Sequence, residues 1–361
     1  MKKIIVSVTN DLSTDQRVHK VCLSLTNNGF KVLLIGRKLP TSLPLTRKYR
    51  THRMSLLFKN GVFFYLEYNF RLFLFLLFHK KDILLANDLD TLLANFLVSR
   101  IQNKKLVYDS HELFTEVPEL INRPTKQKIW LKLEQYILPK LKNTYTVCQS
   151  IADYYNQKYG TNFKVIRNIP VKKNTLKIKK NTKQKIIIYQ GAINIGRGLE
   201  VMIEVMKHLE NIKFIIVGTG DIYKQLQKKV TIENVTDKIT FLGKITPKEL
   251  QKITPTADLG ISLEEDLGLN YRYALPNKLF DYLHANIPVL VSDLPEMKRL
   301  VLAYKIGEIA TSREPKKLAE QIQKILHTGK EKYKNSIQKA QKELQWQHEE
   351  KILLSVFNKL K

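Results

Sequence analysis

The sequence predicts an α/β protein with two Rossmann-like, doubly wound domains. At 361 residues the chain is longer than one hydrophobic core usually supports. A β-branched run at residues 2–9 is followed by a helical pattern at 16–28, a glycine, and a second apolar run at 31–35. This β-α-β order is typical of a parallel sheet with helices on both faces. A second series of the same kind begins at residue 186.

The first domain is expected to comprise residues 1–168. Its later strands are predicted at 83–86, 105–108, 145–148 and 164–167. The segment that follows, 171–185, is rich in lysine and asparagine and poor in apolar residues. Such a composition is typical of an exposed connection between domains.

The second domain is expected to comprise residues 169–340. Its strands are predicted at 186–190, 213–217, 239–242, 259–262 and 289–291. The remaining residues, 341–361, have a helical pattern that includes Trp346. We expect this helix either to complete the second domain or to cross back to the first.

The most hydrophobic stretch is Gly61–Phe78. Glu67 and Arg71 interrupt it at a spacing that lets them pair on a helix, and it lacks the roughly 20 apolar residues of a membrane span. Two interpretations stay open. One is a buried helix packed on the sheet, and the other is a helix lying in the plane of a membrane surface.

Charge and cysteine content limit the partners. The formal net charge is +28, spread along the chain, which reflects either a lysine-rich solvated surface or attraction to nucleoside diphosphates, phosphate-linked acceptors or acidic lipid. We expect no nucleic-acid partner, because no zinc finger, RNA-binding aromatic motif or helix-turn-helix accompanies the charge.

Cys22 and Cys148 form no paired or zinc-binding motif, so we expect a reducing, cytoplasmic compartment and no metal site.

The loop after the first strand does not carry the GxGxxG pattern of dinucleotide-binding domains. A dinucleotide cofactor is therefore not expected in this domain. The loop instead offers Asp, Ser, Thr and Arg side chains to a polyhydroxylated or phosphorylated ligand. The alternative is that Asp15 or a neighbour simply caps the helix that carries Arg17.

Two further strand ends in the first domain carry polar clusters. Asp88 and Asp90 follow one predicted strand, and His111 and Glu112 follow the next. Ligands of open α/β sheets bind outside the carboxyl ends of strands, so these side chains are expected at one site. A capping role is the alternative for His111.

The second domain carries the pattern of an anion site. A glycine-rich turn that starts at Gly191 connects a strand to a helix and contains Arg197, which can neutralise a phosphate. Asn277 and Lys278 lie where another helix should begin, with Pro276 in its first turn, so free backbone N–H groups and an ammonium would converge on an anion. Asp281, one turn later, is the natural partner of a ribose diol.

Taken together, these segments resemble the family 4 retaining glycosyltransferases, also called glycosyl transferases group 1. The resemblance extends over essentially the whole chain and rests on DLSTDQRVHK, ANDLDTLLA, YDSHELFTE, the glycine-rich turn, FLGKI and PNKLFDYLHANIPVLVSD. It implies a GT-B fold, in which two Rossmann-like domains face each other across a cleft. It also implies a UDP- or GDP-sugar bound by the carboxyl-terminal domain.

The resemblance implies roles for individual residues. Donor-binding residues are expected at Gly191, Arg197, Gly243, Lys244, Asn277, Lys278 and Asp281. Catalytic candidates are His111, Asp15 and Glu265, and acceptor-side candidates are Asp88, Asp90 and Glu112. The sequence departs from the family's E-x7-E pattern in two ways. The second acid is an aspartate, Asp281, and the candidates for the first acid, Glu264 and Glu265, lie more than seven residues before it.

The implied activity is transfer of the sugar to a glycan, a lipid-linked acceptor or a small molecule. We expect it to proceed with retention of configuration and without a metal ion or cofactor, in the cytoplasm or at the inner face of a membrane. Two alternatives share the architecture. One is an inactive nucleotide-sugar-binding scaffold, and the other is a sugar-nucleotide 2-epimerase.

Overall fold

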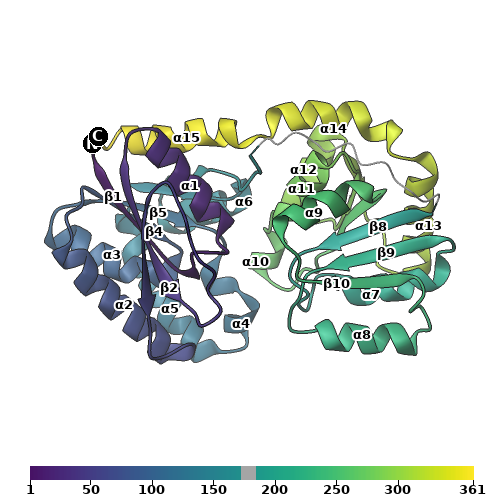
Figure 1. The fold of residues 1–361 in the computed structure, drawn as a ribbon, viewed down its shortest axis with the longest axis horizontal. Coiled ribbons are helices and arrows are strands. Elements are labelled where there is room, and N and C mark those ends of the chain that lie inside the picture. Colours follow the sequence, from purple (N-terminus) through teal and green to yellow (C-terminus); the bar gives the residue numbers. More distant parts are fainter. Residues whose placement is uncertain (172–183) are drawn as a thin grey trace. The chain divides into compact units, whose positions relative to one another are not determined.

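The computed structural model describes residues 1–171 and 184–361 and divides into two compact units (Figure 1). The first unit is Met1–Asn168 together with Gln347–Lys361, and the second is Ile169–Trp346. Most of the segment expected as an exposed connection, 171–185, lies outside the described residues. Both cysteines are buried free thiols.

The first unit is built on a seven-stranded parallel sheet with the order β3-β2-β1-β4-β5-β6-β7. The strands are β1 (Lys3–Asp11), β2 (Lys31–Lys38), β3 (Arg50–Ser55), β4 (Ile83–Asn87), β5 (Lys105–Ser110), β6 (Asn143–Thr146) and β7 (Lys164–Val165). The strand order reverses between β1 and β4, and the carboxyl ends at such a reversal are the usual ligand site of the fold.

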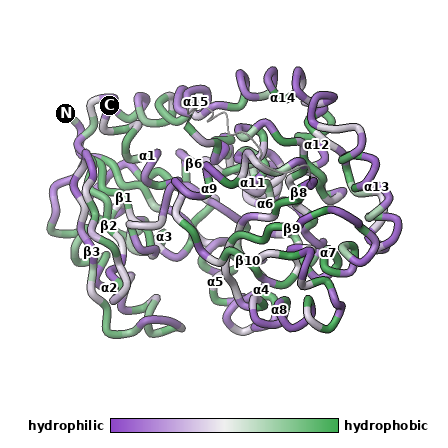
Figure 2. The backbone as a smooth tube through the Cα atoms, turned by 45° about the vertical axis from the view of Figure 1, so that its right-hand side comes forward, coloured by the Kyte–Doolittle hydropathy of each residue, from purple (hydrophilic) through white to green (hydrophobic). Residues whose placement is uncertain are grey.

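Helices cover both faces of this sheet (Figure 1). They are α1 (Gln16–Asn27), α2 (Gly61–Phe78), α3 (Leu89–Ile101), α4 (Pro118–Ile121), α5 (Pro124–Ile137), α6 (Gln149–Tyr159) and α15 (Trp346–Asn358). Helix α2 packs against α3 and α3 against α5, whereas α1 and α15 lie on the opposite side. The strands of both sheets carry much of the hydrophobic colouring (Figure 2).

The second unit repeats this plan with six parallel strands in the order β10-β9-β8-β11-β12-β13. Its strands are β8 (Lys185–Gln190), β9 (Ile212–Val217), β10 (Ile239–Gly243), β11 (Leu259–Ser262), β12 (Val289–Val291) and β13 (Gly307–Ile309). Its helices are α7 (Leu199–Val205), α8 (Tyr223–Ile232), α9 (Pro247–Ile253), α10 (Leu269–Arg272), α11 (Asn277–His284), α12 (Pro295–Tyr304), α13 (Pro315–Thr328) and α14 (Glu331–Glu343). The predicted fold class is confirmed.

The structure differs from the predicted elements at the edges of the sheets. Strand β3 was not predicted because its sequence, RTHRMS, lacks an apolar run and only Met54 in it is buried. Strand β13 was not predicted either, because it has only three residues and none of them is fully buried. Edge strands have a partner on one side only, so they need less apolar sequence than central strands.

The end of the chain forms two helices with a break at residues 344–345. Helix α14 runs to Glu343, and Leu344 is buried in the second unit, where its carbonyl contacts the His284 ring. The last helix therefore begins at Trp346, and not at 341 as predicted. From Gln347 onward, α15 belongs to the first unit, where Glu349 accepts hydrogen bonds from the backbone and side chain of Arg167.

Helix α2 matches the predicted bounds but is not the buried helix that one interpretation expected. Four residues along one stripe are buried, namely Phe64, Tyr68, Leu72 and Leu76. Much of the rest is exposed although it is apolar. Glu67 and Arg71 pair as expected, at 2.8 Å. Among the described residues, α2 is the one helix long and apolar enough to cross a membrane, by length and composition alone.

The attachment of α15 to the first unit can be tested through Phe357. This side chain is fully buried and lies edge-on to Phe30, with ring centroids 6.2 Å apart. We expect Phe357→Ala to lower the free energy of unfolding by about 3–5 kcal/mol, because it leaves a cavity. Chemical denaturation measures the change. Ile352→Ala, a half-exposed position in the same helix, is the control and should cost less than about 1 kcal/mol; equal effects would contradict this packing.

Candidate functional site

A buried ion pair joins α1 to the end of β5. The guanidinium of Arg17 donates to both carboxylate oxygens of Asp109, at 3.2 and 2.8 Å, and to the carbonyl of Ile166 at 3.0 Å. Arg17 is 5% exposed and Asp109 is fully buried. A two-point pair of this kind fixes orientation as well as charge, so α1, β5 and the chain after β7 are held together at the carboxyl edge of the sheet.

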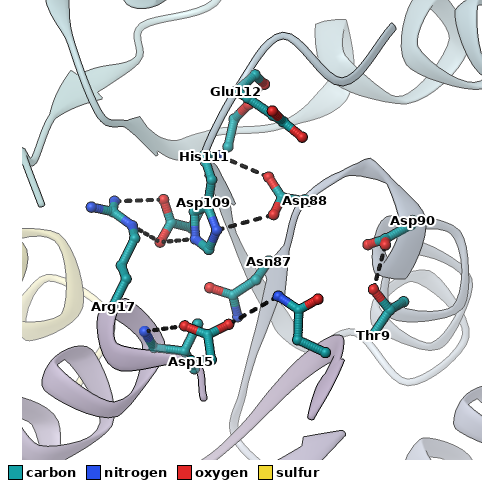
Figure 3. A network of polar contacts seen from close by, with 12 residues as sticks. Thr9, Asp15, Arg17, Asn87, Asp88, Asp90, Asp109, His111 and Glu112 are labelled. Carbon is teal, nitrogen blue, oxygen red and sulfur yellow. Dashed lines mark hydrogen bonds and ion pairs between the residues drawn. The ribbon is translucent and has the colours of Figure 1, made fainter. Parts of the chain in front are cut away.

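His111 lies between two carboxylates (Figure 3). Its Nε2 is 3.0 Å from Asp109, its Nδ1 is 3.0 Å from Asp88, and its backbone N–H donates to Asp88 at 2.7 Å. Burial alone would lower the pKa of His111, but Asp88 and Asp109 outweigh it and raise that pKa well above its ordinary value. The ring is therefore an imidazolium that donates from both nitrogens, and this arrangement commits both of them to carboxylates.

Asp88 adopts a backbone conformation that non-glycine residues rarely use, with φ of 58°. It occupies the N-cap position of α3, yet its side chain makes no cap hydrogen bond there. Its carboxylate binds His111 instead, and its N–H donates to the carbonyl of Asp109 at 2.8 Å. Strained conformations of this kind are retained mainly at functional sites.

Asp90 is a buried carboxyl group in the first turn of α3. Thr9 donates a hydroxyl hydrogen bond to it at 2.5 Å. Burial and the neighbouring Asp88 carboxylate raise the pKa of Asp90 to about 7. Asp90 can therefore change its protonation state near neutral pH, close to the strand ends that carry His111.

The other two predictions for this unit have different outcomes. Asp15 caps α1 by accepting the backbone N–H of Val18 at 3.0 Å and the side-chain amide of Asn10 at 3.2 Å, which is the alternative that the sequence left open. Glu112 follows His111 at the end of β5 and is part-buried (Figure 3). The catalytic and acceptor-side roles of these residues stay predictions.

The second unit holds a buried acid between two cations. The Glu264 carboxylate is 2.7 Å from the Lys278 ammonium and 3.7 Å from the Arg197 guanidinium, and it accepts the Ser262 hydroxyl at 2.7 Å. Glu264 is 1% exposed and Lys278 is 8% exposed. Burial opposes ionisation, yet Lys278 and its hydrogen bonds hold the pKa of Glu264 below its usual value. The three charges sum to one excess positive charge.

Aromatic rings support the two cations. The Lys278 ammonium lies 4.0 Å from the centre of the Tyr189 ring, and the Arg197 guanidinium lies 4.8 Å from that of Tyr271. Ring faces attract cations and limit their motion. Arg197 stays accessible to solvent, with 26% of its side chain exposed, whereas Lys278 is buried.

The glycine-rich turn lies beside this cluster. Gly191 has φ of 140°, and a side chain there would come 3.7 Å from the Lys278 side chain. The preceding residue, Gln190, donates to the Asp281 carboxylate at 3.0 Å and accepts from Thr254 at 2.8 Å. Gly191, Arg197, Lys278 and Asp281 are thus brought together by the ends of β8 and β11 and the start of α11.

The remaining donor-binding predictions lie on neighbouring strand ends. Gly243 ends β10 with φ of 64°, and its carbonyl accepts the N–H of Gly218 at 2.9 Å. Lys244 follows it and is exposed. Asn277 is the exposed first residue of α11, while Pro276 lies at the N-cap rather than inside the first turn as predicted.

The side chain of Glu265 pairs with a third cation, Arg313. The two side chains are 3.1 Å apart, and Glu265 is 36% exposed. Glu264 is the acid that contacts Lys278, whereas the acid predicted from the sequence was Glu265. The sequence did contain a pattern that favours Glu264. It directly follows the apolar residues 259–263, and if these are buried, the acid next to them is buried as well and needs a positively charged partner.

The two adjacent acids provide a matched test. We expect Glu264→Gln to lower the free energy of unfolding by about 3–5 kcal/mol, because it leaves the buried Lys278 ammonium without its carboxylate. Glu265→Gln removes an exposed pair and should cost less than about 1 kcal/mol. Denaturant titration of both variants measures the difference. A ranking in the reverse order would mean that Glu265 occupies the buried position.

Asp90 makes a pH-dependent prediction. Its pKa in the folded state is raised from 3.8 to about 7, so ionisation opposes folding, and stability falls as pH rises through that interval. Asp90→Asn cannot ionise. We therefore expect the free energy of unfolding of this variant, relative to that of wild type, to rise by roughly 1.4 kcal/mol for each pH unit between pH 5 and about pH 7. Chemical denaturation at several pH values measures this difference, and Asp237→Asn, at an exposed position, is the control. If the stability of Asp90→Asn changed with pH in the same way as that of wild type, the prediction would be contradicted.

Two family models match consecutive parts of the chain. The model described as Glycosyltransferase Family 4 matches residues 15–170, and the model described as Glycosyl transferases group 1 matches residues 171–343. Among curated proteins, an uncharacterized glycosyltransferase of Methanocaldococcus jannaschii is 26% identical over 148 residues. That match covers 40% of this chain and 36% of the relative.

Solved structures with similar folds cover nearly the whole chain. Sucrose-phosphate synthase from Thermosynechococcus elongatus has a TM-score of 0.82 at 15% identity, covering 100% of this chain and 99% of that one. The Anabaena protein HepE, solved with UDP and glucose, has a TM-score of 0.76 at 13% identity, covering 99% and 100%. A glycosyltransferase from Rickettsia africae has a TM-score of 0.74 at 13% identity, covering 99% and 98%. At these identities the likeness concerns the fold.

Proposed function

Because the chain belongs to the glycosyltransferases of group 1 and family 4, we propose that its second unit binds a UDP- or GDP-sugar and that the protein transfers the sugar to a glycan, lipid-linked or small-molecule acceptor. The observation that carries this proposal is the cluster of Glu264, Lys278 and Arg197 at the carboxyl end of β11. HepE, which shares the fold, was solved with UDP-glucose, and this supports a nucleotide sugar as the donor.

The excess positive charge of the cluster suits a diphosphate leaving group. As the glycosidic bond to the diphosphate breaks, negative charge grows on the phosphate oxygens and positive charge grows on the sugar. Arg197 and Lys278 would stabilise the first of these charges from fixed positions, which is the most effective form of electrostatic catalysis. The Asp281 carboxylate accepts a hydrogen bond from Gln190, and we propose that it binds the ribose and that Gly243 and Lys244 meet the base.

Glu264 acts on the donor through the two cations. A carboxylate that touches both Lys278 and Arg197 orients them before the ligand arrives, so less reorganisation is needed when charge develops. We propose that Glu264, rather than Glu265, fills the position of the family's first acid. Glu265 is tied to Arg313 and remains a weaker catalytic candidate.

In the first unit, the proposed acceptor-side residues are Asp88, Asp90 and Glu112. With both ring nitrogens engaged, His111 would act as a fixed positive charge and as a support for Asp88. We propose transfer without a metal ion or cofactor and with retention of configuration, in the cytoplasm or at the inner face of the cell membrane. Asp15 caps α1, and a catalytic role for it stays a prediction.

Arg197 gives the direct test of the donor site. UDP or GDP should raise the melting temperature of wild type, because a ligand that binds the native state stabilises it by mass action. Arg197→Gln should weaken nucleotide affinity by about tenfold, since it removes a charge-assisted phosphate contact. The matched control is Arg299→Gln, a half-exposed arginine paired with Glu296 on α12. No shift with either nucleotide, or equal shifts in the two variants, would contradict the proposal.

Product analysis separates the transferase from the two related activities. A transferase consumes the nucleotide sugar to completion only when an acceptor is present. An epimerase would interconvert nucleotide sugars without one, and a scaffold would bind the nucleotide and consume nothing. Mass spectrometry of the donor with and without acceptor extracts measures these outcomes.

A further inference from the structure

The solvent-facing side of α2 is apolar. Exposed along it are Val62 (49%), Phe63 (65%), Leu66 (61%), Phe70 (63%), Leu74 (37%) and Phe78 (77%). They continue onto Leu57 (78%) and Phe58 (47%) in the preceding loop. We call these eight residues the α2 face. A surface helix of a soluble protein normally shows the opposite pattern, so the α2 face calls for an apolar environment.

Helix α2 cannot cross a membrane while the first unit is folded. Its inner stripe is buried against the sheet, and the Tyr68 hydroxyl donates to the carbonyl of Val8 in β1. Asn69 likewise donates to the carbonyl of Asp90 at 2.8 Å. These contacts hold the helix flat on the unit, so only its outer side is available. An apolar environment would therefore be met in the plane of a surface.

Glu67 fixes the loop that extends the α2 face. Its carboxylate accepts the backbone N–H groups of Leu57 and Phe58 at 2.9–3.0 Å and pairs with Arg71. The Glu67 carboxylate is therefore occupied by contacts within the first unit. Because the loop is tied down, Leu57 and Phe58 stay exposed instead of folding inward.

A basic pocket adjoins this loop. It has a volume of about 260 Å³ and is lined by Arg37, Lys38, Leu39, Pro40, Ser55, Leu56, Phe58, Lys59 and Phe64. Phe58 connects the pocket to the α2 face, since its ring lies 5.3 Å from that of Phe63. Three cations and no acid line this pocket, which suits a phosphate group.

Arg37 makes the pocket more than a chance grouping of surface charges. Its guanidinium lies 5.0 Å from the centre of the Phe64 ring and donates to the Lys59 carbonyl at 3.3 Å. Its Nε is buried and has no hydrogen-bond partner within the described chain. A guanidinium held in this way is a fixed positive charge at the pocket, which suits a phosphate group.

Charge favours an anionic lipid surface over a second copy of the chain as the occupant. Exposed Lys59 precedes α2 and exposed Lys80 follows it, so cations flank the α2 face at both ends. Flanking cations are typical of helices that lie at anionic membrane surfaces. Two copies would each carry a formal charge of +28 and would bring these lysines together.

We propose that the α2 face inserts into the surface of an anionic membrane while the pocket of Arg37, Lys38 and Lys59 binds a lipid phosphate. The inference deepens the proposed function, because it places the first unit where a lipid-linked acceptor would be found. Membrane binding is measured without any sugar donor, so the two proposals can fail separately.

Vesicle flotation tests the α2 face. The full chain should float with phosphatidylcholine–phosphatidylglycerol vesicles and much less with phosphatidylcholine alone. Leu66→Gln/Phe70→Gln should reduce binding by at least about tenfold, because two apolar side chains no longer leave water. The matched control is Ile232→Gln/Leu302→Gln, two side chains of similar exposure, 75% and 59%, in the second unit. Equal binding by both double variants would overturn the insertion.

A second pair of variants tests the pocket. Lys38→Gln/Lys59→Gln should reduce the preference for anionic vesicles several-fold, whereas Lys224→Gln/Lys228→Gln removes equal charge from exposed positions on α8 and should leave most of it. Equal losses would mean that net charge, and not the pocket, attracts the lipid. Unchanged thermal stability and nucleotide binding confirm folding. Sedimentation analysis that found a dimer abolished by Leu66→Gln/Phe70→Gln would assign the α2 face to a second copy and overturn the proposal.

Discussion

The buried carboxylate of Glu264 is the constraint on which the proposed donor site depends. An acid with 1% exposure requires positive partners, and here it has Lys278 and Arg197. Glu264 lies just beyond the carboxyl end of the inner strand β11, α11 begins where Lys278 can reach it, and the glycine-rich turn supplies Arg197. One internal ion cluster therefore sets the mutual positions of three segments far apart in the sequence.

The first unit uses the same device with the signs reversed. There the central groups are the Arg17 guanidinium and the His111 imidazolium, and the carboxylates of Asp109 and Asp88 surround them (Figure 3). In both units the charged groups lie at the carboxyl ends of parallel strands, where the reversal of strand order leaves room for a ligand. A fixed array of charges of this kind needs little rearrangement when charge develops in a reaction.

Residue patterns predicted the central strands of both parallel sheets, because short runs of β-branched residues are typical of buried strands and rare in helices and loops. Strands β3 and β13 were not predicted, since edge strands carry too little apolar sequence. The resemblance predicted that Arg197 and Lys278 act together. It could not tell Glu264 from Glu265, because adjacent residues point in opposite directions and only the packed structure shows which one is buried.

Helix α2 shows a different limit of sequence analysis. Its hydrophobicity is visible in the sequence, but which side faces the sheet is not, because apolar residues surround the helix on nearly all sides. Tertiary contacts decide the matter, through the buried stripe that includes Tyr68 and through Glu67, which binds the preceding loop. The result is an exposed apolar surface in a chain with a formal charge of +28, and lysines lie at both ends of it.

The central claim is that the diphosphate of a sugar donor binds at Lys278 and Arg197. A crystal structure of the full chain with UDP tests it most directly. The account predicts phosphate oxygens within hydrogen-bond distance of the Lys278 ammonium and the Arg197 guanidinium, with the ribose on Asp281. UDP bound elsewhere, with Glu264 still the only anionic partner of both cations, would contradict it.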